Sequence, residues 1–409
     1  MEKVEFFDLT DSESFAHRDP LPYLKYLRHT APVSRIFDKT PEAYWAVVKY
    51  NDVLEVHRDV ATYSIECPMV IGHPRELAAH GHKIVIRELD PPRHTKLRNV
   101  LKWDFTPKAV ASWAVPVRRW VREYLAEAAR RGECEFVFDV AARVPMQQFS
   151  EMIGVAEADR PRLENLSNIV AYGQPNANGD AADNVDAVTA NQRLEEYFSR
   201  MLVERARIPA KDLTTTLAHG RIDGDPLSYD EQLRNLAFLL VAGLETTRNG
   251  IASGLYELLQ HRGELEKLVA DPSLVNSAVE EILRYASPIY HDLRMATRDT
   301  MLGGQKIARG DLVSKWLASA NRDEEVFENP DTFDITRNPN PHLAFGYGQH
   351  FCLGANLARV EMRTTLEELI PYLRQIELTD TPQRTNNSAI QGYWRMPIRF
   401  RNVNRSIHV

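Results

Sequence analysis

Cys352 lies in the segment with the strongest pattern for chemistry, Ala344 to Gly354, which reads A-F-G-Y-G-Q-H-F-C-L-G. Gly346 and Gly348 allow the backbone to take positive φ, which other residues reach only at a cost. Such a loop folds tightly and brings N–H groups close to one sulfur atom. The next residues, N-L-A-R-V-E-M-R-T-T-L, have apolar positions at helical spacing, and a helix N-terminus favours a thiolate over a thiol. We therefore expect Cys352 to be a metal ligand or a nucleophile; the alternative is a buried free cysteine.

This loop resembles the haem-ligating loop of cytochrome P-450 enzymes. The pattern F-G-x-G-x-H-x-C-x-G is matched by Phe345, Gly346, Gly348, His350, Cys352 and Gly354. The resemblance implies that Cys352 is the axial thiolate of haem b (iron protoporphyrin IX). It also implies that Phe345, Gly346 and Gly354 are cofactor-binding residues. A thiolate ligand pushes electron density onto the iron and favours O–O cleavage. A buried free cysteine would leave the surrounding glycines unexplained.

A second pattern lies in the apolar segment 237–254, which we expect to form the middle of a long helix. Ser228 is its expected N-cap, because Glu231 follows three residues later. A-G-x-E-T-T in this segment resembles the family's oxygen-activating helix. The resemblance implies that Thr246 hydrogen-bonds dioxygen on the iron and that Glu245 delivers protons from bulk water. The alternative is a Thr bonded to its own helix, as mid-helix Thr often is, and a Glu that faces the surface.

Four basic residues match positions where the family binds the haem propionates: His94, Arg98, Arg294 and His350. Charge-assisted bonds from Arg and His suit two carboxylates in a partly buried site. His94 and Arg98 are four residues apart, so the alternative for this pair is the solvent-exposed face of an amphipathic helix. Asp292 is a further candidate for a propionate contact. Ala242, on the oxygen-activating helix, joins the cofactor-binding residues by resemblance.

Glu281 and Arg284 form an E-x-x-R pattern, which places both side chains on one helix face. Pairs of this kind usually lie on a solvated surface. Their position in the chain resembles the family's buried ion pair beneath the haem. Arg337 or His342 is the expected third partner, and the expected role is structural.

The resemblance also implies the walls of a substrate pocket: Phe238, Val241, Ala242, Ile289, Tyr290 and Ile390. Most of these are apolar, so burial should drive binding at roughly 25 cal/mol per Å². The loop 174–184 is the expected lid. The hydroxyl of Tyr290, with His291 and Asp292 close by in sequence, suggests a mainly lipophilic substrate that carries a polar group. The alternative is that His291 and Asp292 face the propionates or solvent.

Composition is that of an ordinary globular chain. The 409 residues carry 50 basic and 57 acidic side chains, for a net charge of −7, which gives no support to nucleic-acid binding. The first twenty residues resemble neither a signal peptide nor an anchor, and the apolar run 237–243 is far too short for a membrane span. Three cysteines form no disulfide framework, so we expect a cytoplasmic protein.

Helical patterns dominate the chain, and strand signals gather at 289–318 and 389–402, which predicts a mainly α fold with a minor β region. The resemblance covers nearly the whole length and implies one cytochrome P-450 haem domain, 1–409, without a fused reductase. It implies a monooxygenase that takes electrons from NAD(P)H through a separate ferredoxin and ferredoxin reductase. Arg93 and Lys96 are expected to point outward, toward an acidic ferredoxin.

Two other classes of protein remain open: a non-catalytic haem protein (electron carrier or gas sensor) and a peroxide-using variant, which typically lacks the acid–alcohol pair. The segment 287–307 resembles bacterial members that act on steroids and terpenoids. Similar sequences occur in natural-product secondary metabolism, where a carrier protein can hold the substrate.

Overall fold

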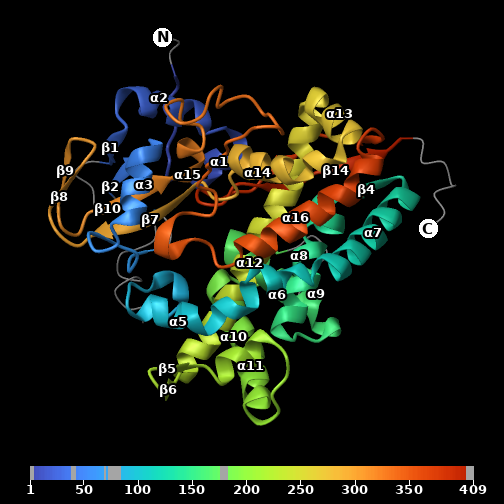
Figure 1. The fold of residues 1–409 in the computed structure, drawn as a ribbon, viewed down its shortest axis with the longest axis horizontal. Coiled ribbons are helices and arrows are strands. Elements are labelled where there is room, and N and C mark those ends of the chain that lie inside the picture. Colours follow the sequence, from blue (N-terminus) through green and yellow to red (C-terminus); the bar gives the residue numbers. More distant parts are fainter. Residues whose placement is uncertain (1–3, 38–42, 69–70, 72–83, 176–182, 402–409) are drawn as a thin grey trace. The chain divides into compact units, whose positions relative to one another are not determined.

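The computed structural model describes residues 4–37, 43–68, 71, 84–175 and 183–401 (Figure 1). The chain divides into two compact units, each assembled from separate segments. The first unit comprises Met1–Lys83, Ala252–Cys352 and Ile370–Met396, and the second Ile84–Ile251, Leu353–Leu369 and Pro397–Val409. The single haem domain expected from the sequence stays a prediction.

The first unit contains a five-stranded sheet in the order β1-β2-β10-β7-β3. The strands are β1 (Val33–Ile36), β2 (Tyr44–Val47), β3 (Tyr63–Ser64), β7 (His291–Ala296) and β10 (Leu312–Trp316). Strand β10 runs parallel to β2 and antiparallel to β7, and the register pairs Lys315 with Asp292 and Val313 with Arg294. Residues directly opposite each other, and residues two apart on one strand, share a face. Asp292, Arg294 and Lys315 therefore project from the same face.

Several helices also belong to the first unit. They are α1 (Ser12–His17), α2 (Leu21–Thr30), α3 (Tyr50–Arg58), α13 (Arg262–Ala270), α14 (Val275–Ala286) and α15 (Leu317–Ala320). Helices α3 and α15 contact the sheet (Figure 1). Smaller strands are β8 (Thr300–Leu302), β9 (Gln305–Ile307), β11 (Ile376–Leu378), β12 (Gln383–Arg384) and β13 (Tyr393–Arg395). The strands predicted at 289–318 are thus confirmed.

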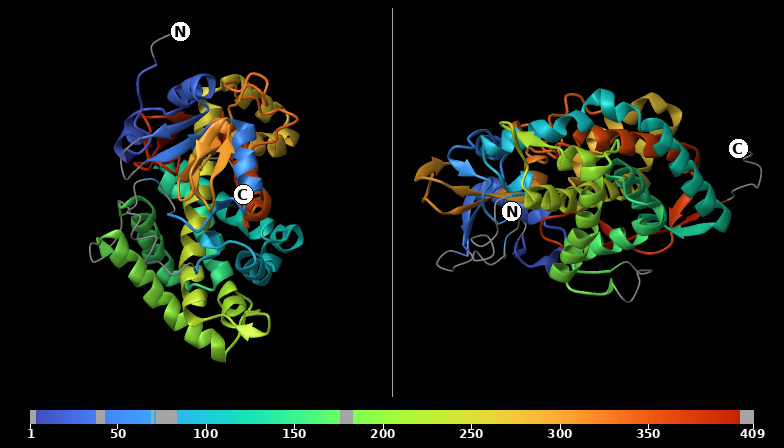
Figure 2. Two further views of the ribbon diagram at one scale, coloured as in Figure 1. Left: turned by 90° about the vertical axis from the view of Figure 1, so that its left-hand side faces the viewer. Right: turned by 90° about the horizontal axis from the view of Figure 1, so that it is seen from below.

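The second unit is mostly helical. Its helices are α5 (Arg93–Leu101), α6 (Pro107–Ala111), α7 (Ala114–Arg131), α8 (Arg143–Ile153), α9 (Arg160–Tyr172), α10 (Ala187–Arg207), α11 (Leu213–Ala218) and α16 (Ala355–Leu369). Helix α9 lies beside α10, and α7 beside α16 (Figure 2). Strand β4 (Glu133–Glu135) pairs with β14 (Pro397–Phe400), and β5 (Arg221–Ile222) with β6 (Asp225–Pro226). Apolar side chains from most of these helices form one buried core.

Helix α12 (Tyr229–Gln260) spans 32 residues and contributes to both units. It begins at the predicted capping box: Ser228 N donates to Glu231 Oε2 at 2.9 Å, and Glu231 N donates to Ser228 Oγ at 3.2 Å. None of the described helices is both long enough and apolar enough to cross a membrane. The mainly helical fold with minor sheets agrees with the fold class expected from the sequence.

Candidate active site

The cysteine loop has the backbone that its glycines predict. Gly346 and Gly348 have φ of 69° and 70°, in the left-handed region that favours glycine. The loop closes on itself because Cys352 N donates to Phe345 O at 2.9 Å. The Cys352 side chain is exposed, whereas Cys67 is buried. Cys352 is therefore not a buried cysteine, and its role as the iron ligand stays a prediction.

Polar side chains gather on the sheet face that carries Arg294. Lys315 Nζ lies 2.8 Å from Asp292 Oδ1, and Arg294 Nη1 lies 3.7 Å from Asp292 Oδ2. His57, on α3, places its ring nitrogens 3.2 and 3.4 Å from Lys315 Nζ. Burial, and then the charge of Lys315, hold the pKa of His57 well below its usual value, and His350 and Arg294 act in the same direction. Asp292 therefore faces Lys315 and Arg294, and a contact between Asp292 and a haem propionate stays a prediction.

His94 and Arg98 lie on α5 in the second unit, where His94 is buried and Arg98 half-buried. The burial of His94 shows that this face of α5 is not the solvent-exposed one. Arg93 and Lys96, expected to point outward, form ion pairs with Glu231 and Asp223. Each of the two side chains is 42% exposed, so both are accessible to solvent although both are in ion pairs.

In the middle of α12, one face of the helix is only half-buried. Phe238, Val241, Ala242 and Thr246 share this state, at spacings of three to four residues that place them on one side. Thr246 Oγ1 donates to Ala242 O at 3.1 Å, as expected for a mid-helix threonine. Apolar side chains and one hydroxyl thus share a single face.

Glu245 projects from α12 into the protein. Its carboxylate lies 3.0 Å from Arg248 Nη2, and Ser167 Oγ on α9 donates to it at 3.3 Å. Burial raises the pKa of Glu245, and the charge of Arg248 partly offsets this. The alternative of a surface-facing Glu is therefore wrong. A carboxyl with a raised pKa holds its proton more readily near neutral pH.

Arg248 extends this network and was missed from the sequence. Its Nη1 donates to Asn168 Oδ1 at 2.5 Å, and its guanidinium lies 4.8 Å from the ring centroid of Tyr172. Asn249 Nδ2 donates to the Tyr172 hydroxyl at 2.9 Å. The available signal was the run E-T-T-R-N, which puts a full charge in the middle of an apolar helix.

A sequence model of the cytochrome P-450 family matches residues 145–392. The chain belongs to the cytochrome P-450 family. Steroid C26-monooxygenase of Rhodococcus jostii is 36% identical over 401 residues, which cover 95% of this chain and 83% of that protein. Methyl-branched lipid omega-hydroxylase of Mycobacterium bovis is 36% identical over 388 residues, which cover 91% and 89% of the two chains.

A solved structure of similar fold is a cytochrome P-450 in complex with an acyl carrier protein ligated to hexadec-9Z-enoic acid. It has a TM-score of 0.83 and 30% identity, and the match covers 95% of this chain and 99% of that chain. The present chain, as a cytochrome P-450, is a monooxygenase, and its family implies a haem–thiolate cofactor. Bacterial members of the family take electrons from redox partners.

The residues of the first unit fit a haem with two carboxylates. The cytochrome P-450 loop presents an exposed thiol, and the adjoining sheet face holds two buried cations, Arg294 and Lys315, around one carboxylate. Anionic groups suit such a face. Phe345 of the same unit is half-buried. In the second unit, Gly354 accepts the first hydrogen bond of α16, from Ala358 N at 2.9 Å.

The E-x-x-R pair of this cytochrome P-450 is fully buried. Arg284 donates to both carboxylate oxygens of Glu281 at 2.8 Å, and both side chains are 0% exposed. Arg337 Nε lies 3.2 Å from Glu281, which makes it the third partner, whereas His342 pairs with Glu280 at 3.0 Å. Arg284 also donates to three backbone carbonyls, so the pair anchors the segment that leads to the cysteine loop.

Ile289 and Ile390 are brought together by a β-bridge, and both are half-buried. Tyr290 N donates to Ala389 O at 2.8 Å, but the Tyr290 ring is buried and lies 5.1 Å from that of Phe15. Neighbouring residues of an extended segment point to opposite sides. The core position of Tyr290 disfavours a polar contact to substrate, and its role as a pocket wall stays a prediction. Most of the expected lid, 176–182, lies outside the described residues.

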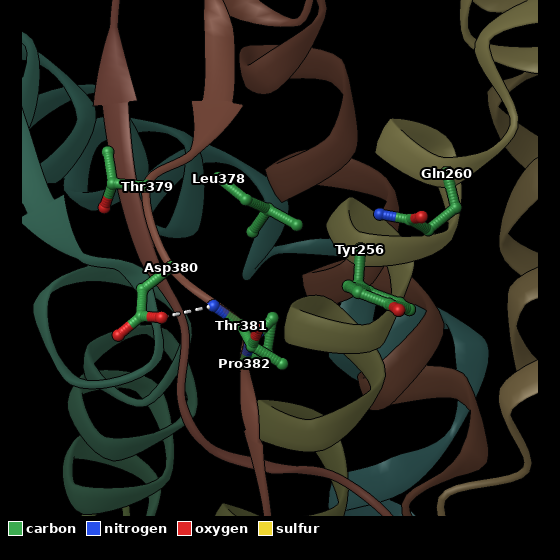
Figure 3. Close-up of a pocket in the computed structure, with 7 residues that line it drawn as sticks. All are labelled: Tyr256, Gln260, Leu378, Thr379, Asp380, Thr381 and Pro382. Atoms are coloured by element: carbon green, nitrogen blue, oxygen red, sulfur yellow. Dashed lines mark hydrogen bonds between the residues drawn. The ribbon is translucent and has the colours of Figure 1, made fainter.

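A surface pocket of about 430 Å³ lies in the first unit (Figure 3). Tyr256 and Gln260 line it from the end of α12, and Leu378, the last residue of β11, lines it together with the four residues that follow, up to Pro382. In that segment Thr381 N donates to Asp380 Oδ1 at 2.7 Å. The pocket includes no residue expected to bind haem or substrate, so we assign it no part in catalysis.

Proposed function

We propose that this protein is a haem b monooxygenase that hydroxylates or otherwise oxidises a steroid-like or branched lipid molecule. The half-buried face of α12 carries this proposal, because it combines apolar Phe238 and Val241 with the Thr246 hydroxyl. The two relatives support the substrate class, since one is named for steroid oxidation and the other for branched-lipid hydroxylation. The complex of a related protein with an acyl carrier protein supports testing a carrier-bound acyl chain as well.

In this proposal Cys352 ligates the haem iron, and Arg294, His350, His94 and Arg98 bind the haem carboxylates. The haem supplies the activation of dioxygen when it is bound. The protein supplies binding, orientation and protons. Electrons come from NAD(P)H through a separate ferredoxin and its reductase.

Thr246 and Glu245 are the proposed proton-handling residues. The Thr246 hydroxyl is held to Ala242 O in this structure and can exchange that bond for one within the active site. Burial raises the pKa of Glu245 and so favours its protonated form, and the hydrogen bond from Ser167 keeps the carboxyl in place. Reprotonation requires the Arg248 ion pair to loosen, which makes Arg248 a positioning residue for Glu245.

Burial of apolar surface is the proposed source of substrate affinity. Asp292 is held by Lys315, and Tyr290 lies in the core, so neither supports a polar contact to substrate. Each methylene group buried by the substrate should contribute about 0.8 kcal/mol, close to fourfold in affinity.

A spin-shift titration of the purified holoenzyme tests the substrate class. We expect a steroid or a methyl-branched fatty acid to shift the haem spectrum, and Phe238→Ala to weaken both. An acyl chain offered free and on a carrier protein separates the two modes of delivery. Adding a hydroxyl to a matched hydrocarbon scaffold should give no gain in affinity, and a gain that Tyr290→Phe abolishes would restore the polar-contact hypothesis.

Product formation separates the classes of function. The monooxygenase requires NAD(P)H, ferredoxin and reductase for product. An electron carrier or gas sensor would bind and cycle without product, and a peroxide-using enzyme would form product from peroxide alone.

A further inference from the structure

Lys315 is the only buried lysine among the described residues of the first unit. It lies in β10, a strand whose last four residues are all buried, and its side chain is 0% exposed. Lysine is almost never fully buried unless it is paired, because the charged ammonium loses its hydration. The neighbours of Lys315 must therefore account for its presence.

His57 and Asp292 are those neighbours. Lys315 Nζ lies 2.8 Å from Asp292 Oδ1 and 3.2 Å from His57 Nδ1. The lowered pKa of His57 makes its imidazole neutral, so a ring nitrogen can accept a hydrogen bond from the ammonium. His57 is itself buried, on the face of α3 that packs against the sheet.

Two buried cations converge on one carboxylate in this cluster. Lys315 and Arg294 are 0% and 1% exposed, and Asp292 contacts both. The convergence of two positive charges on one negative charge gives this sheet face a cationic character. A buried face of that kind favours an anion, most of all a carboxylate that can accept charge-assisted hydrogen bonds.

The same cluster adjoins the cysteine loop. A Cβ atom placed on Gly346 would lie 3.4 Å from His57 Cε1, and one placed on Gly348 would lie 3.5 Å from the His57 carbonyl oxygen. Helix α3 packs against the short helix Gly348–His350 of that loop. His57 therefore stands between Lys315 and the loop that carries the predicted iron ligand.

We propose that Lys315 is a further cation that binds a haem carboxylate, together with Arg294, and that His57 is a positioning residue that orients the Lys315 ammonium. Asp292 pairs with the Lys315 ammonium while no other anion is bound. This inference rests on the proposed haem binding. It adds two residues that the sequence pattern did not indicate.

The test measures haem retention in the holoenzyme of Lys315→Met, which nearly keeps the length of the side chain and removes its charge. Transfer of haem to an apoglobin acceptor should become about tenfold faster, as expected for the loss of a charged hydrogen bond. Lys315→Arg should stay within about threefold of wild type, because it keeps the charge. Lys306→Met is the matched control, since Lys306 is an exposed lysine of the same unit.

Haem dimethyl ester, which lacks the carboxylate charges, distinguishes carboxylate binding from a packing role. When the holoenzyme is reconstituted with this ester, wild type and the Lys315→Met variant should lose haem at the same rate. An equal acceleration by Lys315→Met with both haems, or no acceleration with native haem, would overturn the proposal.

The reduction potential gives a second measurement, which needs only the holoenzyme. Loss of a buried cation should move the potential to more negative values in Lys315→Met and not in Lys315→Arg. His57→Leu should shift the potential part of the way in the same direction. His57→Gln, which keeps a hydrogen-bond acceptor, should have a potential close to that of wild type. If Lys315→Met keeps normal thiolate ligation and an unchanged reduction potential, this inference alone is overturned. If wild type binds no thiolate-ligated haem, the proposed function is overturned.

Discussion

Glu361 on α16 is a buried carboxyl whose protonation should control stability. It is 2% exposed, and the Thr247 hydroxyl on α12 is its side-chain hydrogen-bond partner. The two helices approach each other closely at Gly250, where a Cβ would lie 3.0 Å from Met362 Sδ. Burial raises the pKa of Glu361 from 4.5 to about 8.

The gap between those pKa values corresponds to about 5 kcal/mol. The folded protein holds the proton more tightly than the unfolded chain does, so the stabilisation is complete below pH 4.5 and is lost as the pH rises toward 8. A rise from pH 6 to pH 9 should therefore lower the free energy of unfolding by about 3 kcal/mol through this one carboxyl.

Urea unfolding of the holoenzyme at pH 6, 7.5 and 9 measures this loss. Glu361→Gln is isosteric and cannot ionise, so its stability should fall by about 3 kcal/mol less than that of wild type over this range. Glu328→Gln, at an exposed position, is the control and should follow wild type. Parallel curves for wild type and Glu361→Gln would refute the reasoning.

Three further sets of substitutions test the site. Thr246→Ala should still bind substrate and consume reductant but release much of the oxygen as peroxide, and Glu245→Gln should slow turnover with a changed solvent isotope effect; unchanged coupling and rate in both would exclude the proton-handling role. Arg284→Met should destabilise the protein by about 3–5 kcal/mol, because Glu281 would lose its main buried partner. Haem retention should fall, whereas substrate affinity per bound haem should not change. Normal haem retention would contradict a structural role. Charge reversal at Arg93 and Lys96 should raise KM for an acidic ferredoxin more at low salt than at high salt; an equal effect at every ionic strength would show that only the local ion pairs had been lost.

Local patterns predicted the structure well. The capping box at Ser228 and the positive φ of Gly346 each depend on residues within four positions of one another. Thr246 bonds to its own helix, as the alternative for this residue described. The third partner of Glu281 was narrowed to two residues, and Arg337 takes that place. Such features follow from backbone geometry, which a short stretch of sequence determines.

Contacts between distant segments were not predictable in the same way. His57 and Lys315 are 258 positions apart and meet only because α3 packs beside β10. The surface-facing alternative for Glu245 stayed open because the sequence does not show that α9 covers that side of α12. The core position of Tyr290 depends on strand alternation at an irregular bridge, where a shift of one residue reverses the side chain.

The spectrum of the reduced, CO-bound protein tests the central claim most directly. Wild type should show the red-shifted Soret band of a thiolate-ligated haem. Cys352→Ala should lose that band, and Cys67→Ala, which removes a buried cysteine, should keep it. A thiolate band that survives in Cys352→Ala would contradict the assignment of Cys352 as the iron ligand.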